Sequence, residues 1–347
     1  MTSRARVLFV DDEPHLLAGL RRSLHTRGVG WQISFAASGA EALDLMTAEP
    51  CDAVISDMRM PGMDGAQLLD RIRRAHPGTA RFVLSGEADR DAVLASASVA
   101  HQFFDKPCDV ENIIAVVDRV LTLRSSLDDP GLRDLLGGIG PLPMLPATHA
   151  ALTAAVACID AADQTAPRIL ATDIAGCAEV LRLTNSAFFG VPRRFATMAE
   201  AVSLLGPETL RALVTSGAVV REVAPGGEPE LESLNHRARQ RVEAVQRIAH
   251  EQQWPDAETA RTALAALLLE IGTLALASGE EPLGPTDHPP GQLSAYLLTL
   301  WGFGEDVVSL VAGFDIEPGT AADLDSAAQA LRTADRTLHP EPVEEVV

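Results

Sequence analysis

The sequence is poor in basic and aromatic residues. It has 28 Lys and Arg against 48 Asp and Glu, for a formal net charge of −20, and aromatic residues make up 4% of it with a single Tyr. Phosphate backbones and anionic membrane surfaces are bound mainly through Lys and Arg, and unpaired bases through stacking on aromatic rings. We therefore expect neither DNA nor a membrane among the partners.

The sequence also has few cysteines and no long uninterrupted apolar run. Its four cysteines form no C-x-x-C pair, which argues against a disulfide framework or a zinc site. The N-terminal apolar stretch is too short for a signal peptide. The run ALAALLLEIGTLALA at residues 263–277 contains Glu270, and it falls short of the about 18–20 apolar residues that span a bilayer. We expect a cytoplasmic protein.

The first 124 of the 347 residues alternate short apolar runs with amphipathic stretches. RVLFV, ISFAA, AVIS, RFVL and HQFF predict strands, and the segments between and after them predict helices. Five such units predict an α/β flavodoxin-like fold, (βα)5, with a parallel sheet covered by helices on both faces. Ligand chemistry in such a sheet gathers beyond the carboxyl ends of the strands.

Polar side chains follow four of the predicted strands at those ends. They are Asp11, Asp12, Asp57, Ser85 and Lys106. Carboxylates that converge on one sheet edge repel one another unless a cation lies among them, and Mg²⁺ prefers such oxygen ligands. A lysine and a hydroxyl at the same edge suit a phosphoryl group, since they supply a positive charge and a hydrogen bond.

The motifs LFVDDEP, SDMRMPGMDG, VLSG and FDKP resemble those of a response-regulator receiver domain. The resemblance implies that Asp57 accepts a phosphoryl group from a histidine kinase or a phosphotransfer protein. It also implies Mg²⁺ as the cofactor, bound by Asp12, Asp57 and the main-chain carbonyl of Arg59, with Asp11 acting through water.

The same resemblance implies that Lys106 and Ser85 contact the phosphoryl oxygens and that Phe103 is the switch aromatic residue. Arg59 and Glu87 flank the site, where they either pair and slow attack by water or are two surface residues. Each acid alone also fits a solvated strand end, and a degenerate receiver is a further alternative. The complete set in order favours a competent site.

The chain changes character after residue 124. Residues 125–140 form a linker, with six glycines or prolines from Gly131 to Pro143, in which Leu132, Leu135 and Leu136 are placed to dock on a neighbour. From residue 147 onward the apolar spacing is helical, so we expect a second, all-α domain over residues 141–340. Residues 341–347 form an acidic tail that we expect to be disordered.

The stretches PLPMLPATHAAL, EVLRLTNSAFFG and AEAVSLLGPETLRALV are similar to the HDOD domain, a relative of HD-type metal phosphohydrolases. The resemblance places a structural turn at a set of five residues. They are Asn185, Ser186, Phe188, Phe189 and Gly190. Such a turn needs local hydrogen bonds and a glycine.

Glu270 lies in LLLEIG, where HD-type enzymes carry LLHDIG. Leu269 replaces the metal-binding histidine and Glu270 the aspartate, and leucine cannot bind a metal. We expect Glu270 to be a remnant acid that is hydrogen-bonded or partly exposed, because an unpaired buried carboxylate is costly. No cofactor is expected in this domain.

These observations predict a two-component response regulator with a non-catalytic HDOD output domain. Phosphorylation would repack the Ser85–Phe103 side of the sheet and change the contacts of the fourth and fifth helices. That change would free or dock the second domain for an unknown downstream protein, or create a homodimer face. Two alternatives remain: a phosphodiesterase or nucleotidase using His236, Glu270 and His288, and a sensor that binds cyclic dinucleotides.

Overall fold

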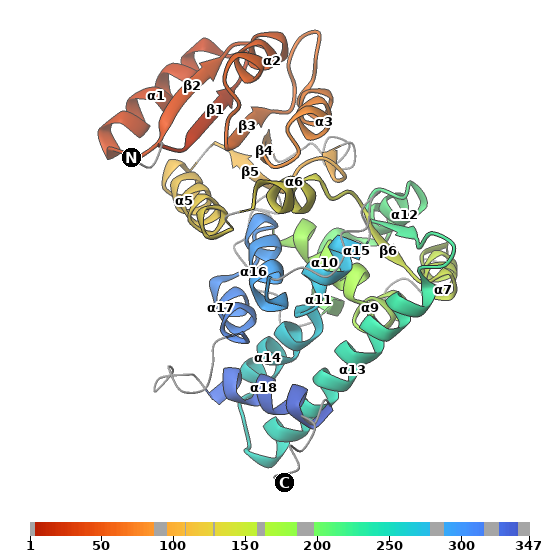
Figure 1. The fold of residues 1–347 in the computed structure, drawn as a ribbon. Helices are drawn as coiled ribbons and strands as arrows, with labels where there is room; N and C mark the ends of the chain where they lie inside the picture. The colour runs from red at the N-terminus through yellow and green to blue at the C-terminus, as the bar shows by residue number, and fades with distance from the viewer. Residues whose placement is uncertain are drawn as a thin grey trace.

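The computed structural model describes residues 4–86, 96–107, 109–127, 129–157, 164–185, 198–277, 288–315 and 326–338. An α/β region formed by the N-terminal part of the chain lies above a larger helical region (Figure 1).

The α/β region is built on five parallel strands in the order β2-β1-β3-β4-β5. The strands are β1 Arg6–Val10, β2 Gln32–Ala36, β3 Ala53–Asp57, β4 Ala80–Gly86 and β5 Gln102–Lys106. The central strand β3 is buried along its whole length, as expected for a sheet covered on both faces. The predicted flavodoxin-like fold is confirmed.

Helices α1 Pro14–Arg27, α2 Gly39–Ala48, α3 Gly65–Ala75 and α5 Val110–Ser126 cover this sheet. Side chains in the sequence fix where three of them begin. Ser38 accepts a hydrogen bond from Glu41 N–H, Asp64 one from Gln67 N–H, and Asp109 two from the first turn of α5. Such caps satisfy backbone donors that the helix leaves unpaired.

The linker contains a helix, α6 Pro130–Gly138, that packs between the α/β region and the second region and contacts both. Leu132 and Leu136 are buried, which confirms that this segment docks. Gly78 N–H donates to Asp134 Oδ1 at 3.1 Å. A Cβ added at Gly137 would lie 2.5 Å from the carbonyl oxygen of Pro77, so only glycine permits this approach of two backbones.

The second region is mostly helical. Its helices are α7 Pro146–Ala157, α9 Thr165–Leu170, α10 Ile174–Thr184, α11 Met198–Leu205, α12 Pro207–Thr215, α13 Glu228–Glu251, α14 Asp256–Leu268, α15 Ile271–Ala277, α16 Pro290–Leu300, α17 Glu305–Gly313 and α18 Ser326–Leu338. The expectation of helices alone after residue 147 was wrong in one detail. Strand β7 Val220–Glu222 pairs in parallel with β6 Leu142–Met144.

Two apolar stretches of this region, residues 165–184 and 256–277, are each divided into two helices. Asp173 separates α9 from α10, because its carboxylate caps α10 by accepting from Gly176 N–H. Leu269 and Glu270 separate α14 from α15. Ser294 Oγ of α16 bridges that break, donating to Leu269 O at 2.6 Å and accepting from Gly272 N–H at 2.9 Å.

The stretch Asp256–Ala277 is long and apolar enough to cross a membrane by length and composition alone, yet 67% of its most apolar window is buried inside the protein. The same apolarity is what a core helix needs.

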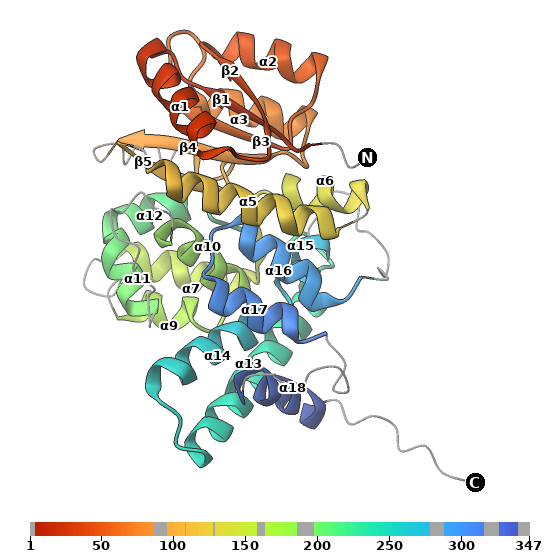
Figure 2. The ribbon, with the colours of Figure 1, turned by 90° about the vertical axis from the view of Figure 1, so that its left-hand side faces the viewer.

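Helix α5 lies between the sheet and the second region and runs beside α16 (Figure 2). The two regions are therefore in direct contact.

Candidate functional site

Three carboxylates meet at the carboxyl edge of the five-stranded sheet. Asp11 and Asp12 follow β1, and Asp57 is the last residue of β3. Oxygen atoms of Asp11, Asp12 and Asp57 all lie within 4.8 Å of one another. Because parallel strands end at the same edge, residues 45 positions apart reach one point.

Lys106 lies among these acids, at the end of β5. Its Nζ is 2.8 Å from Asp11 Oδ2 and 2.6 Å from Asp57 Oδ1. Burial raises the pKa of Asp57, although Lys106 draws it down. Burial lowers the pKa of Lys106, but its hydrogen bonds to Asp11 and Asp57 outweigh this and raise the pKa overall. The ammonium group partly offsets the cluster's negative charge.

The segment after Asp57 folds tightly against it. Arg59 N–H donates to Asp57 Oδ2 at 3.1 Å, and Gly65 N–H donates to Met58 O at 2.9 Å. A Cβ added at Gly65 would lie 2.3 Å from the carbonyl oxygen of Asp57, so glycine is required there. The start of α3 is thereby held against the end of β3.

Ser85 and Phe103 lie on the neighbouring strands β4 and β5. Ser85 is 2% exposed, and its Oγ is buried without a hydrogen-bond partner. A buried hydroxyl normally has a partner, so an orphaned one next to the acidic cluster fits a ligand oxygen that binds there. Phe103 is 1% exposed, with its ring inside the domain.

The donor set fits the group that the sequence implies. Three carboxylates suit Mg²⁺, which is bound by oxygen and keeps several waters. Lys106 and Ser85 supply a charge and a hydroxyl for phosphoryl oxygens. The predicted roles of Asp11, Asp12, Asp57, Ser85 and Lys106 remain predictions, and Glu87 lies outside the described residues.

Glu270 meets arginines instead of a metal-binding partner. Its Oε1 accepts hydrogen bonds from Arg241 Nη2 and, at 3.2 Å, from Arg237 Nε, both on α13. Arg241 Nε also donates to Asp335 Oδ1 of α18 at 2.7 Å. Burial raises the pKa of Glu270, but Arg241 and Arg237 outweigh it and lower the pKa overall. The prediction of a hydrogen-bonded acid is confirmed.

The other residues considered in the second region do not gather around Glu270. His236 is exposed on α13 and His288 is half-buried. Among the described residues, the acids at the sheet edge are the one group of three or more metal-ligating side chains. Asn185 ends α10, while Ser186, Phe188, Phe189 and Gly190 lie outside the described residues.

Sequence reasoning overlooked a buried polar cluster at the opposite, N-terminal edge of the sheet. Arg81 N–H of β4 donates to His101 Nδ1 at 2.9 Å, and His101 Nε2 lies 2.8 Å from Arg81 Nη2 and 3.0 Å from Gly137 O. The Arg81 side chain donates to carbonyls of Val99, Thr79 and Gly137. An arginine in the apolar run RFVL was the available signal.

A second overlooked pair joins the two regions. Arg182 and Glu179 of α10 form a buried ion pair at 2.8 Å. Arg182 also donates to Ala97 O at 2.6 Å and Ala100 O at 2.8 Å, both just before β5. Burial raises the pKa of Glu179, and Arg182 opposes this rise. In the neighbouring cluster, burial lowers the pKa of His101 well below 6.5. The contact is polar, and each nitrogen of the Arg182 guanidinium has a partner.

Two known families match the chain in succession. The response regulator receiver domain matches residues 7–118, and the HDOD domain matches residues 142–284.

Curated relatives resemble one part of the chain. The DNA-binding transcriptional regulator NtrC of Klebsiella pneumoniae is 37% identical over 114 residues, which are 33% of this chain and 24% of NtrC. The transcriptional regulatory protein GlrR of Escherichia coli K12 is 34% identical over 139 residues, 40% of this chain and 31% of GlrR. The chain thus spans about a quarter to a third of these relatives.

Among solved structures, the signal receiver domain of an HD domain-containing protein from Pseudomonas fluorescens Pf-5 is 28% identical. It covers 36% of this chain and 99% of its own, with a TM-score of 0.34.

Proposed function

Because the chain is a response regulator, with a receiver domain matched over residues 7–118 and an HDOD domain over 142–284, we propose that phosphorylation of Asp57 controls a non-catalytic HDOD output domain. A receiver implies a histidine kinase or phosphotransfer protein as the phosphoryl donor. In this proposal the receiver occupies residues 1–124, the linker 125–140, the HDOD domain 141–340 and an acidic tail 341–347.

The observation that carries the proposal is the position of Lys106 between Asp11 and Asp57. One cation beside three carboxylates leaves the edge negative, so it attracts a divalent cation. Asp12, Asp57 and the Arg59 carbonyl would hold Mg²⁺, with Asp11 acting through water. When bound, Mg²⁺ would neutralise charge on the transferred group.

The side chains at the sheet edge have separate roles in the transfer of the phosphoryl group. A carboxylate oxygen of Asp57 attacks the phosphorus, and the bond from phosphorus to the donor breaks. Lys106 then moves its hydrogen bond from the Asp57 carboxylate to a phosphoryl oxygen, and the unpaired Ser85 Oγ donates to another. Phe103 is the switch residue that follows this rearrangement.

The non-catalytic role of the second domain is supported by the surroundings of Glu270. Two arginines already neutralise this carboxylate, and the neighbouring Leu269 has no ligand atom. A phosphodiesterase or nucleotidase using His236, Glu270 and His288 is the rival. Stoichiometric transition metal in the purified protein, together with turnover of cyclic dinucleotides, would establish that rival instead.

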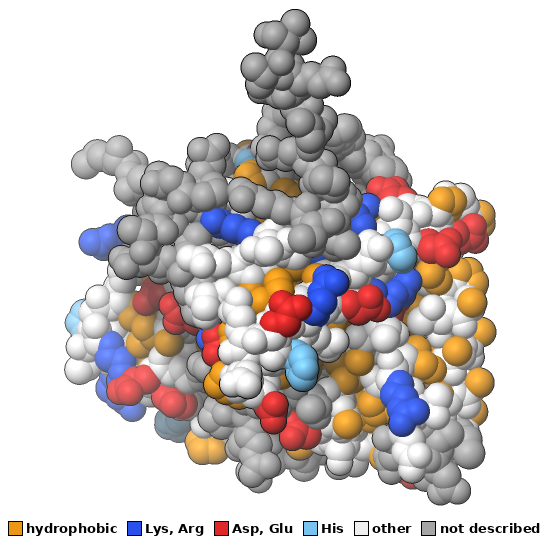
Figure 3. All heavy atoms as spheres, turned by 90° about the horizontal axis from the view of Figure 1, so that it is seen from below, with side chains coloured by type: hydrophobic (Ala, Val, Ile, Leu, Met, Phe, Trp, Pro, Cys, Tyr) orange, Lys and Arg blue, Asp and Glu red, His pale blue; other side chains and the backbone are white. Residues whose placement is uncertain are grey.

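The expected partners follow from charge and domain content. We propose a downstream protein, or a second copy of this chain, as the target, with the protein in the cytoplasm and neither DNA nor membrane bound. NtrC is a DNA-binding regulator, but this chain spans only 24% of it. On the face in Figure 3, basic side chains are interspersed with acidic ones among the described residues.

The signal would travel through the contact between the domains. Helix α5 packs on α16, and Arg182 reaches the segment before β5, so repacking around Phe103 reaches both contacts through the strand. Hydrogen exchange with and without beryllofluoride and Mg²⁺ tests this step. Unchanged exchange in α5, α10 and α16, with unchanged light scattering, would exclude it.

Phosphorylation itself is tested with acetyl phosphate and Mg²⁺. We expect intact-mass spectrometry to find one added phosphoryl group on the wild type and on Asp44→Asn, an exposed aspartate of α2. Asp57→Asn should show none. Labelling of Asp57→Asn equal to wild type would place the acceptor elsewhere.

A further inference from the structure

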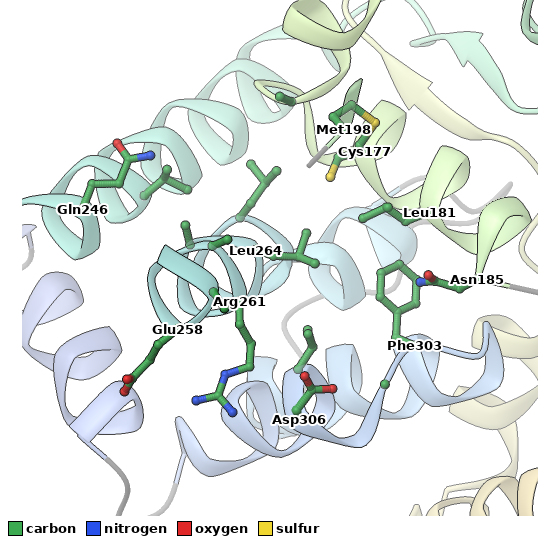
Figure 4. A pocket seen from close by; sticks show the side chains of 18 of the residues that line it. Cys177, Leu181, Asn185, Met198, Gln246, Glu258, Arg261, Leu264, Phe303 and Asp306 are labelled. Carbon is green, nitrogen blue, oxygen red and sulfur yellow. The ribbon is translucent and has the colours of Figure 1, made fainter. Parts of the chain in front are cut away.

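The helical domain contains a cavity of about 700 Å³ between α10, α13, α14 and the start of α17 (Figure 4). Its wall is mostly apolar. Leu181 and Phe303 approach the space from one side in Figure 4, and Leu264 approaches it from the other. Sites for small molecules have volumes of about 300–1,000 Å³ and walls of this kind. Glu270 is not part of this wall.

The polar groups of the wall argue against an anionic ligand. Glu258, Arg261 and Asp306 line one margin, so two carboxylates accompany one guanidinium. The whole chain carries a net charge of −20, which adds to the repulsion of anions. A cyclic dinucleotide brings two phosphates and meets a single arginine here. The chemistry fits a largely apolar molecule that is neutral or carries one positive charge.

One wall of the cavity is the front of a helix whose back contacts the receiver. Cys177 and Leu181, one turn apart on α10, line the cavity. Arg182 and Glu179 lie on the opposite side of the same helix. There Arg182 donates to the carbonyl oxygens of Ala97 and Ala100 in the receiver. A rotation or shift of α10 therefore changes the cavity and the domain contact together.

A second wall is held by the receiver in the same way. Phe303 lines the cavity just after α16. Gln102 of β5 donates through Nε2 to Thr299 O at 3.1 Å and to Leu300 O at 3.0 Å. Gly302, with φ +80°, lies so near that an added Cβ would be 2.7 Å from Gln102 Oε1.

We propose that this cavity binds one small, largely apolar, non-anionic molecule, and that its occupancy is coupled to the docking of the receiver on α10 and on residues 299–303. By linkage, the factor by which the ligand changes the docking equilibrium is also the factor by which docking changes the affinity for the ligand. Binding and coupling are tested on the unphosphorylated chain, so this proposal can fail or stand whether or not Asp57 is phosphorylated.

Binding is tested by titrating the full chain with Nile red, a neutral apolar dye whose fluorescence reports burial. We expect saturable binding of one dye per chain. Ala263→Phe fills the cavity from α14 and should weaken binding by about tenfold or more. Ala154→Phe places the same ring on the exposed side of α7 and should bind like the wild type.

Circular dichroism shows whether Ala263→Phe folds. Ala260→Phe, which fills the same cavity from one turn earlier, serves if it does not. The binding site is refuted if the wild type shows no saturable binding, or if a folded, filled variant binds as tightly as the wild type.

Coupling is tested with Gln102→Met, which removes both hydrogen bonds to α16 without burying a charge. We expect the dye affinity to change by about threefold or more with the stoichiometry unchanged. Gln67→Met, on an exposed position of α3, is the matched control. Equal affinities in the two variants would refute the coupling and leave the binding site standing.

Discussion

The two acidic sites of this protein differ in how their charge is balanced. At the sheet edge, Asp11, Asp12 and Asp57 share one lysine and remain negative. In the helical domain, Glu270 meets Arg237 and Arg241, and Arg241 also meets Asp335. The first site has an excess of acid and an unpaired hydroxyl beside it, whereas the second balances its charges internally.

Under the proposed function, this difference separates a site that receives a ligand from one that holds the fold together. At the sheet edge the excess negative charge is available to a divalent cation, and burial raises the pKa of Asp57, although Lys106 opposes this. A carboxylate completed by arginines needs no ligand, and the pKa of Glu270 is lowered. Four measurements sharpen or break this contrast.

The largest effect should follow the loss of Arg241. Arg241→Ala leaves Glu270 buried with the more exposed Arg237 alone, and should lower the free energy of unfolding by about 3 kcal/mol or more. Urea unfolding measures it. Glu270→Leu with Arg241→Met should recover most of the loss, because no buried charge is then left unpaired. If Arg241→Ala were as stable as the wild type, the ion pair of Arg241 and Glu270 would not stabilise the fold.

Magnesium should act on the first site alone. At about ten times its dissociation constant, Mg²⁺ should stabilise the wild type by about 1.4 kcal/mol. Asp12→Asn should lose this increment and be more stable without the ion, since it relieves repulsion in the cluster. Glu270→Gln should keep the increment. A Mg²⁺ increment lost in Glu270→Gln would mean that the helical domain binds the ion. Thermal unfolding with and without Mg²⁺ provides the readout.

Acid should weaken the buried polar cluster formed by Arg81 and His101. His101 faces Arg81 and Arg182, and burial holds its folded pKa well below the ordinary 6.5. Its contribution to stability is complete above 6.5 and is lost as the pH falls below it, because only the unfolded chain takes up the proton. From about pH 7.5 to about 5.5, the wild type should lose about 1 kcal/mol more than His101→Ala.

This comparison cancels the opposite contribution of Asp173. Burial raises the folded pKa of Asp173 to about 6, so its contribution grows as the pH falls toward 4, equally in both proteins. Parallel stability curves for the wild type and His101→Ala would show that His101 does not carry the effect.

The smallest effect concerns how long the phosphoryl group persists. Arg59 is exposed two residues after Asp57. If it shields the group from water, Arg59→Ala should shorten the lifetime by about threefold, because attack by water becomes easier. Arg74→Ala, an exposed arginine of α3, is the control. The decay of labelled protein measures the lifetime, and equal decay would make Arg59 a surface residue.

The sheet-edge cluster could be predicted because its residues lie within one or two positions of the ends of predicted strands. Strand polarity then brings Asp11, Asp57 and Lys106 together without knowledge of any side-chain contact. The surroundings of Glu270 could not be predicted in this way. Its partners Arg237 and Arg241 lie 33 and 29 positions earlier in the chain, and they reach Glu270 only because α13 packs on α14.

The divisions of the helices were hidden for a similar reason. Both depend on residues distant in sequence: Asn235, which donates to Asp173, and Ser294, which bridges the break at Leu269. The strands β6 and β7 have three residues each and pair across about 80 positions, too short to show a period. Arg81, in contrast, could have been noticed, since a charge inside an apolar strand needs partners.

The close approach of Gly137 to Pro77 limits how the chain can be divided and recombined. Helix α6 directly precedes the helical domain in the sequence, yet Asp134 and Gly137 bind the backbone and Arg81 of the receiver. A chimaera joined at residue 124 would graft a foreign segment onto this surface and leave the Arg81 guanidinium short of an acceptor. The smallest interchangeable cassette that keeps these contacts is therefore residues 1–138.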